Sequence, residues 1–145
     1  MKLFVIVLSL ALAACAGIDE TTLRCADCPV ALVVHIIDGN TLDTSMGRVR
    51  LFGVDTPERR EQCASEATDR LRELAGDQVR LEDGPRLTDR YGRRLAYVYT
   101  ESGISIDAVL IREGFTTAWT RDGQHRDGLV ELEQEARREY AGCLW

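Results

Sequence analysis

The chain has 145 residues, of which 45% are hydrophobic and 29% are charged, as in an ordinary globular protein with one domain. Its 24 acidic and 18 basic residues give a net charge of −6, which argues against broad adhesion to nucleic acid through a basic surface. Any anionic ligand must therefore be held by a local cluster of cations.

The N-terminal segment has the layout of a secretory signal, with Lys2, an apolar run and then small residues. The run is shorter than the roughly 20 residues that a membrane-spanning helix needs. The sequence Leu12-Ala13-Ala14-Cys15 resembles a bacterial lipobox, which implies cleavage before Cys15 and attachment of lipid to its sulfur. We therefore expect a signal peptide over 1–14, a tether over 15–29 and a domain over 30–145. The protein would be exported and lipid-anchored to the cell envelope, or secreted after ordinary signal cleavage.

The cysteine content agrees with an oxidising compartment. If Cys15 carries lipid, four cysteines remain, and their spacing alone does not choose among three pairings. Cys25 and Cys28 have the spacing of a redox motif, but no βαβ pattern surrounds them. A four-cysteine zinc site is disfavoured, because zinc modules usually bring two close pairs. We expect structural disulfides, with a long bridge from Cys63 to Cys143 that ties the first helix to the C-terminus.

Most of the first half of the domain has the pattern of strands. The run "ALVVHIID" is β-branched and nearly continuous, as in a buried strand, and Asp38-Gly39-Asn40 predicts a tight hairpin turn after it. In "GRVRLFGVD" the side chains alternate, so that Arg50 shares a face with Phe52 and Val54. The expected strands are 31–38, 41–45, 47–55, 77–83 and 93–102, with a turn-rich segment over 84–92.

Three helices are expected between and after the strands. The first covers 57–76, because Pro57 suits a first helical turn and Gly76 a helix end. The second covers 105–114 and the third 127–142, each with an apolar stripe and a terminal glycine. Together these elements predict an α+β fold in which a small closed or partly closed barrel of about five strands is packed with three helices.

Chemistry-bearing residues occur at the ends of these elements. Arg50 lies beside apolar neighbours, where a guanidinium needs an anionic partner, although an arginine at a strand end also reaches solvent easily. The segment 55–58 suits a helix N-terminus, and the same geometry fixes Asp55 and nearby carbonyls where a hard cation needs them. Arg93 follows the turn at 89–92. Two arginines with Asp, Asn and Glu form the set that phosphoryl chemistry requires, because arginine forks stabilise phosphate charge and a carboxylate handles water.

Five motifs occur in an order that resembles the staphylococcal nuclease (thermonuclease) family. They are "VVHIIDGNTL", "VRLFGVDTPE", "DRYGRRLAYVY", "IDAVLIREG" and the closing "LW", and the resemblance covers Ala31 to Trp145. It implies an OB-fold-like, five-stranded β-barrel with three helices. It also implies calcium-dependent hydrolysis of phosphodiester bonds in DNA and RNA, single-stranded or frayed, which leaves 3′-phosphate ends.

The resemblance assigns roles to matching residues. Arg50 and Arg93 look like the phosphate-binding arginines, and Glu58 looks like the general base or the group that orients the attacking water. Asp55 and the Thr56 carbonyl match calcium ligands. Tyr91 matches a tyrosine on the phosphate side of the nucleotide.

Three further aromatic residues receive no role from the resemblance. Trp119 is a weaker candidate for stacking on a base, with core packing as the alternative. His35 and His125 are expected to be structural or surface residues rather than catalysts.

Asn40 is the departure from the family pattern, which has a calcium-binding aspartate at that position. An amide keeps a carbonyl oxygen but lacks the charge, so calcium affinity should fall unless Asp38 compensates. Activity would then be low, shifted in metal preference, or absent.

Two hypotheses follow for the function of the protein. It is an extracytoplasmic, metal-dependent nuclease, or it is a non-catalytic OB-type module that binds nucleic acid, nucleotide or a protein partner at the envelope. In either case we expect a monomer.

Overall fold

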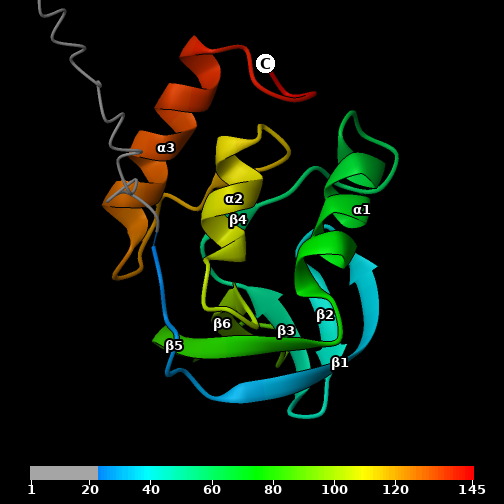
Figure 1. Ribbon diagram of the computed structural model, residues 1–145. Coiled ribbons are helices and arrows are strands. Elements are labelled where there is room, and N and C mark those ends of the chain that lie inside the picture. The colour runs from blue at the N-terminus through cyan, green and yellow to red at the C-terminus, as the bar shows by residue number, and fades with distance from the viewer. Residues whose placement is uncertain (1–22) are drawn as a thin grey trace, which may run out of the picture.

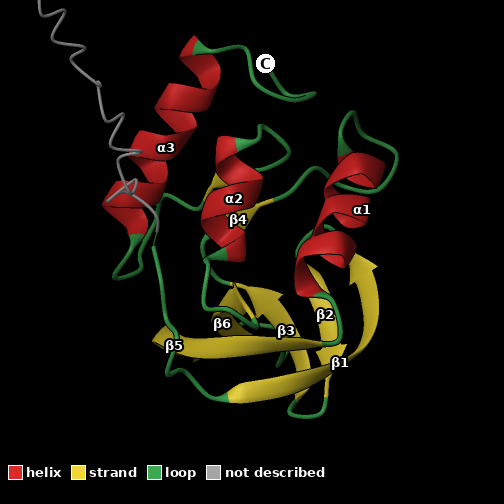
Figure 2. Ribbon diagram, viewed as in Figure 1, coloured by secondary structure: helices red, strands yellow, loops and turns green. Residues whose placement is uncertain are grey.

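The computed structural model describes residues 23–145, and its centre is a closed five-stranded barrel. Around the barrel the strands follow the order β1-β2-β3-β6-β5, and the three helices lie together on one side of it (Figures 1 and 2). The strands are β1 (Val30–Asp38), β2 (Thr41–Thr44), β3 (Gly47–Leu51), β5 (Gln78–Thr88) and β6 (Arg94–Thr100). The helices are α1 (Ala64–Ala75), α2 (Ile106–Arg112) and α3 (Arg126–Arg138). The predicted α+β fold, an OB-fold-like barrel of five strands with three helices, is confirmed.

The predicted turn over 38–40 joins β1 to β2 in an antiparallel hairpin. The Asn40 backbone N–H donates to Oδ1 of Asp38 at 3.1 Å, a local side-chain bond that favours a turn over a continued strand. A Cβ on Gly39 would lie 2.6 Å from Cγ2 of Thr56 and 2.8 Å from Cβ of Ala67. Glycine is therefore required here, because the turn packs directly against α1 and the segment that precedes it.

The strand expected over 47–55 is wrong in its second half. β3 ends at Leu51, and Val54–Asp55 form a separate strand, β4, which pairs with β7 (Thr117–Ala118) in a small sheet. The break occurs because the Gly53 N–H donates to the buried carboxylate of Asp107 at 2.8 Å. The chain thus leaves the barrel for the helical layer after Leu51.

The first helix also begins later than predicted, at Ala64 rather than Pro57. Arg60 and Cys63 have φ angles of 78° and 74°, in the left-handed region that a right-handed helix excludes. Residues 57–63 therefore form a loop, so Glu58 lies in this loop and not in a first helical turn.

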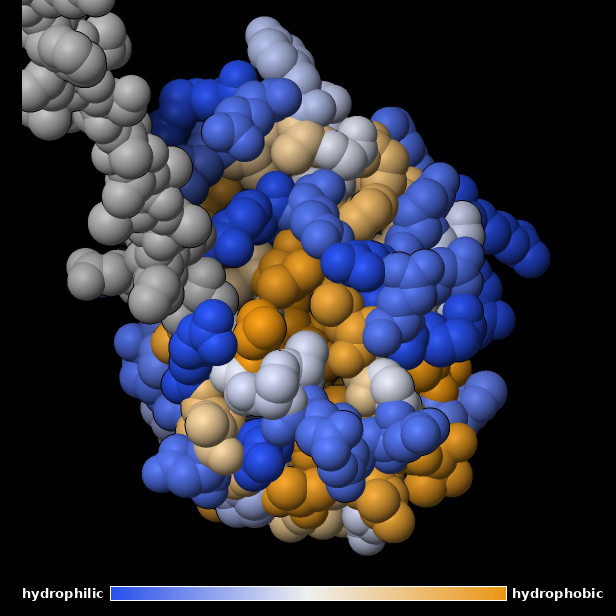
Figure 3. All heavy atoms as spheres, in the orientation of Figure 1, coloured by the Kyte–Doolittle hydropathy of each residue, from blue (hydrophilic) through white to orange (hydrophobic). Residues whose placement is uncertain are grey.

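β1 is less buried than its apolar sequence suggested. Val30, Leu32 and Val34 are 45%, 58% and 70% exposed, because the barrel covers only one face of the strand. In Figure 3 apolar side chains reach the surface at the bottom of the barrel, over this strand. The core lies inside the barrel and between the barrel and the helices. Its largest fully buried side chains are Tyr97, Tyr99, Phe52, Leu42, Leu51, Leu71 and Leu81.

Both disulfides of the described chain agree with the sequence-based expectation. Cys63 is bonded to Cys143, as predicted, and Cys25 is bonded to Cys28, with Cα atoms 5.6 Å and 5.5 Å apart. The described part of the expected tether lies against the domain, since Arg24 forms a β-bridge with Ile104.

The expected signal peptide and Cys15 lie outside the described residues. Within 23–145, no helix has the length and apolar character needed to cross a membrane.

Candidate active site

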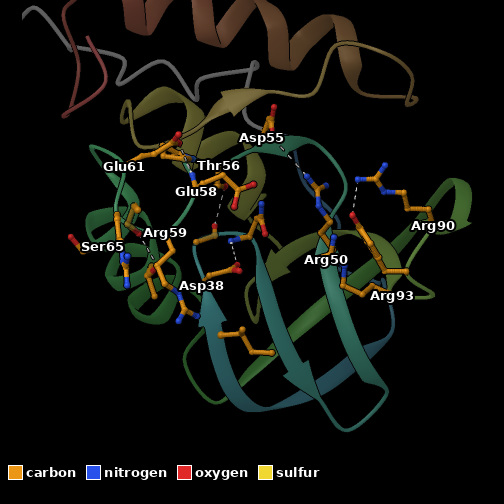
Figure 4. A pocket seen from close by; sticks show the side chains of 18 residues that line it. Asp38, Arg50, Asp55, Thr56, Glu58, Arg59, Glu61, Ser65, Arg90 and Arg93 are labelled. Carbon is orange, nitrogen blue, oxygen red and sulfur yellow. Dashed lines mark hydrogen bonds and ion pairs between the residues drawn. The ribbon is translucent and has the colours of Figure 1, made fainter.

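One cleft of about 710 Å³ gathers most of the predicted site residues. Its walls are the β1–β2 turn, the segment after β4, the end of β3 and the turn before β6 (Figure 4). The predicted residues that line it are Asp38, Asn40, Arg50, Asp55, Thr56, Glu58, Tyr91 and Arg93. Trp119 does not line this main cleft but borders the adjoining one. The structure thus brings the candidates together, while the chemical role of each stays a prediction.

Arg50 is a fixed, largely buried cation on one side of the main cleft. Its side chain is 14% exposed and donates to the carbonyls of Leu51 at 3.0 Å and Val54 at 3.4 Å. Nη2 lies 4.0 Å from Oδ1 of Asp55. Burial lowers the pKa of Arg50, and the neighbouring Arg93 acts in the same direction, yet a guanidinium stays charged at neutral pH. The backbone break after β3 therefore supplies the carbonyls that orient this arginine.

Arg93 is held by Asp89, a residue that the sequence identified only as part of a turn. The Nε of Arg93 donates to Oδ2 of Asp89 at 2.6 Å, and Oδ1 accepts from the backbone N–H groups of Tyr91 and Arg93. Burial alone would raise the pKa of Asp89, but the hydrogen bonds from Arg93 and Tyr91 outweigh it and hold that pKa below its ordinary value. Asp89 is therefore ionised at neutral pH and fixes both the turn and the guanidinium.

The opposite side of the main cleft is rich in oxygen. Asn40 accepts through Oδ1 from the Thr41 hydroxyl at 2.8 Å, and its carbonyl accepts from Leu51 N–H at 2.8 Å. The Asp55 side chain is 64% exposed and faces Arg50 (Figure 4). Within the described residues, no three His, Cys, Asp or Glu side chains gather as a metal site by themselves. A cation here would need the Asn40 amide and the Thr56 carbonyl in addition to the carboxylates of Asp38 and Asp55.

That donor set fits a hard cation in kind, because every candidate atom is an oxygen. It fits less well in charge, since only two of the four donors are carboxylates. Calcium binding at this site, and the reduced affinity expected from Asn40, therefore stay predictions.

Glu58 is exposed and lies on the loop at the edge of the main cleft. Its backbone N–H donates to Oε2 of Glu61 at 2.8 Å, and the Glu61 N–H donates to the Glu58 carbonyl at 2.9 Å. These two bonds close a short turn at the Glu58 backbone. The sequence did not predict the contact between Glu58 and Glu61, because its pattern indicated a helix from Pro57 onward in place of this turn.

A second, arginine-rich cleft of about 610 Å³ adjoins the main cleft. Five arginines and two aspartates line it, together with Tyr91, Leu95 and Trp119. The arginines are Arg50, Arg86, Arg90, Arg93 and Arg121. This is the local cluster of cations that an acidic protein needs in order to hold an anionic polymer.

Trp119 is the centre of the arginine-rich cleft. The guanidinium carbons of Arg121, Arg50 and Arg86 lie 5.1, 5.7 and 5.9 Å from its ring centre. Its Nε1–H donates at 2.7 Å to Asp122, which also pairs with Arg86. Trp119 thus contacts the cations directly, and base stacking on its ring stays a prediction. No local pattern marks Arg86 or Arg121 as site residues, because they come together only in the folded chain.

The remaining aromatic candidates divide as expected. Tyr91 is 68% exposed, and its hydroxyl accepts from Arg90 at 2.6 Å. His125 pairs with Glu82 at 2.9 Å and packs on Tyr97, and neither it nor His35 lines the two clefts. These contacts are those of a structural histidine and a surface histidine.

Comparison with known proteins identifies relatives over most of the chain. Residues 48–145 match the family described as "Staphylococcal nuclease homologue". An uncharacterized endonuclease of Escherichia coli O157:H7 is 33% identical over 119 residues, covering 78% of this chain and 74% of the relative. A micrococcal nuclease of Shigella flexneri is 35% identical over 126 residues, covering 78% and 71%. A thermonuclease of Staphylococcus hyicus is 30% identical over 119 residues, covering 73% and 70%.

Proposed function

This chain belongs to the staphylococcal nuclease homologue family, and from that premise we propose that it cleaves DNA and RNA outside the cytoplasm by attack of water on phosphate. Family membership makes it a hydrolase and a nuclease. The observation that supports the finer proposal is that Arg50, Glu58 and Arg93, from three separate segments, line one cleft.

In this proposal Arg50 and Arg93 hold the scissile phosphate. Each guanidinium presents several N–H donors in a planar fork, which matches phosphate oxygens. Arg50 is oriented by backbone carbonyls and Arg93 by Asp89 before substrate arrives. Donors fixed in advance stabilise the extra charge of the transition state without the cost of reorganisation.

Glu58 acts on the attacking water. Its carboxylate orients the water and accepts a proton as the new oxygen–phosphorus bond forms, which is the action of a general base. The bond from phosphorus to the 5′ oxygen then breaks, and that oxygen takes up a proton from solvent. One product thus ends in a 3′-phosphate and the other in a 5′-hydroxyl. A module that only binds nucleic acid has no need for a carboxylate at this position.

Calcium is the expected cofactor, with Asp38, Asn40, Asp55 and the Thr56 carbonyl as the residues that would hold it. When bound, it would supply positive charge beside the phosphate oxygens. Since Asn40 brings no charge, we expect weaker affinity than a third carboxylate would give.

The substrate is proposed to be single-stranded or frayed DNA and RNA. An extended strand in the main cleft would pass the exposed Tyr91 and continue into the arginine-rich cleft around Trp119. Stacking of a base on Trp119 would not depend on which base is present, which suits cleavage without sequence preference. Export and a lipid anchor at Cys15 are further parts of this proposal, supported by the N-terminal sequence. A monomeric state is also expected.

A cleavage assay tests the function. The purified protein is incubated with single-stranded DNA in a series of calcium concentrations and in chelator, beside a Glu58→Gln variant. We expect calcium-dependent cleavage that chelator abolishes and the variant lowers by at least 100-fold. Wild-type cleavage no faster than that of Glu58→Gln at any calcium concentration would instead support the non-catalytic binding module, which Asn40 favours.

A further inference from the structure

The loop that carries Glu58 has very little hydrophobic anchoring. We call residues 56–63 the Glu58 loop; it contains no helix or strand. Cys63 is the only buried residue between Val54 and Ala67, with 2% of its surface exposed. A segment with so few packed side chains keeps one conformation only if other bonds replace the missing packing.

The backbone of the Glu58 loop is also in an uncommon conformation. Arg60 and Cys63 have φ angles of 78° and 74°, which non-glycine residues adopt at a cost. Such conformations persist where the surrounding structure enforces them. The reciprocal hydrogen bonds between Glu58 and Glu61 shape the turn from within, but they do not fasten it to the rest of the molecule.

The start of the loop is attached to the β1–β2 turn, where the Thr56 hydroxyl donates to the Gly39 carbonyl at 3.5 Å. The end of the loop is attached to the C-terminal segment. Cys63 is bonded to Cys143, 80 positions later, and the Gln62 side-chain amide donates to the Cys143 carbonyl. That segment is itself held against the end of α2, because Leu144 N–H donates to the Gly114 carbonyl at 3.2 Å. A Cβ on Gly142 would lie 2.2 Å from the Glu113 carbonyl, so the two chains are in close contact there.

We propose that the Cys63–Cys143 disulfide is a positioning device for Glu58, so that the catalytic rate depends on this covalent bond. The inference rests on the proposed function, in which Glu58 acts on the attacking water. A carboxylate on a mobile loop would spend less time in reach of that water, and a misplacement of about 1 Å can cost on the order of 100-fold in rate. Substrate binding would change little, because Arg50 and Arg93 are held by other elements.

The competing explanation is that the disulfide only stabilises the fold. Closing a long loop restricts the unfolded chain and raises stability wherever it occurs. The two explanations differ in what they predict for a protein that is still folded: positioning lowers kcat at constant KM, whereas pure stabilisation leaves both constants unchanged well below the melting temperature.

The experiment compares three variants of the full chain with the wild type. Cys143→Ser and the double variant Cys63→Ala with Cys143→Ala both remove the bond, and the second leaves no unpaired thiol there. The matched control is Cys25→Ser with Cys28→Ser, which removes the other disulfide, whose residues line neither cleft. Circular dichroism fixes an assay temperature at which all proteins are folded. We expect kcat on single-stranded DNA to fall at least tenfold in the first two variants, with KM within twofold, and the control to keep its kcat.

A second measurement reports on the loop without any need for activity. Arg59 and Arg60 are exposed trypsin sites within the Glu58 loop. We expect cleavage after these two residues, located by mass spectrometry, to be at least tenfold faster without the Cys63–Cys143 bond and unchanged in the matched control. Unchanged kcat in folded variants, or equal trypsin rates, would overturn the proposal. A wild type that cleaves no nucleic acid would refute the proposed function instead, and the trypsin rates would still decide whether the bond orders the loop.

Discussion

At the scale of single residues, Asn40 is the residue that we expect to limit the affinity of the proposed cation site. Its Oδ1 already accepts from the Thr41 hydroxyl, a bond that a carboxylate in the same place would keep. We therefore expect Asn40→Asp to add charge without disturbing the turn and to tighten calcium binding about tenfold, or ~1.4 kcal/mol. Isothermal titration of both proteins with calcium measures the difference. Equal affinities would place Asn40 outside the cation site.

We expect that even lysine cannot replace Arg50 without a loss of activity. A lysine keeps the charge but loses the fork that contacts the Leu51 and Val54 carbonyls and would grip a phosphate. We expect Arg50→Lys to lower kcat/KM about 100-fold, by analogy with removal of one preorganised donor. The matched control is Arg48→Lys, two residues away, where the side chain is 54% exposed and pairs with Asp43. If both variants lose activity equally, the fork of Arg50 has no special part in the reaction.

At the scale of elements, the turn before β6 is stabilised by a single carboxylate. Asp89 accepts from the N–H groups of Tyr91 and Arg93 and from the Arg93 guanidinium. Asp89→Asn removes the charge and one acceptor, so Arg93 should lose its fixed orientation. We expect steady-state kinetics to show kcat/KM about tenfold lower, a loss of ~1.4 kcal/mol. Asp83→Asn, which breaks the exposed pair with Arg94, serves as the control and should stay within twofold.

The elements also show what sequence patterns reveal and where they stop. The hairpin turn at Gly39 and the helix that begins after Ser105 follow local rules of turn and cap chemistry, so the sequence predicted both. The break after Leu51 depends on Asp107, 54 positions beyond Gly53, and no local pattern contains it. The delayed start of α1 depends likewise on Cys63, whose partner is Cys143. Long-range bonds override local propensity at both places, and both lie beside the candidate site.

At the scale of the whole molecule, the candidate site exists only because the barrel closes. Arg50 on β3 and Arg93 directly before β6 come close together because β3 pairs in parallel with β6, a contact that periodicity does not predict. The family resemblance assigned both arginines to one phosphate site, and so the main cleft was predictable without knowledge of that pairing. Arg86 and Arg121 belong to no motif that was recognised, and their contact with Trp119 comes from folding alone. The arginine-rich cleft was therefore missed, although the acidic composition had indicated that some such cluster must exist.

Asp107 connects α2 to β6 and to the chain that follows β3, and it should make the stability of the whole molecule depend on pH. It is fully buried on α2, and its carboxylate accepts from Gly53 N–H at 2.8 Å and from Val98 N–H at 3.0 Å. Burial raises its pKa to about 6, although the backbone hydrogen bonds oppose that change. Between these two pKa values the folded protein keeps a proton that the unfolded chain has already lost. The contribution of Asp107 to stability is therefore fully present below the ordinary pKa of 3.8, and it is lost as the pH rises through about 6.

The variant Asp107→Asn removes this titration. Its folded state loses stability by an amount that does not depend on pH, because the new amide NH₂ faces one of the two backbone N–H groups. A pKa difference of this size corresponds to about 3 kcal/mol. We therefore expect the unfolding free energy of the wild type, measured with urea, to fall relative to the variant by about 3 kcal/mol between about pH 3 and pH 7. The lowered pKa values of Glu82 and Asp89 act in the opposite direction, but they are present in both proteins and cancel. Asp127→Asn, at a carboxylate that is 88% exposed, is the control for charge removal. A difference that stays constant over this range would show that Asp107 keeps one protonation state in the folded protein, because its two backbone donors would then outweigh its burial.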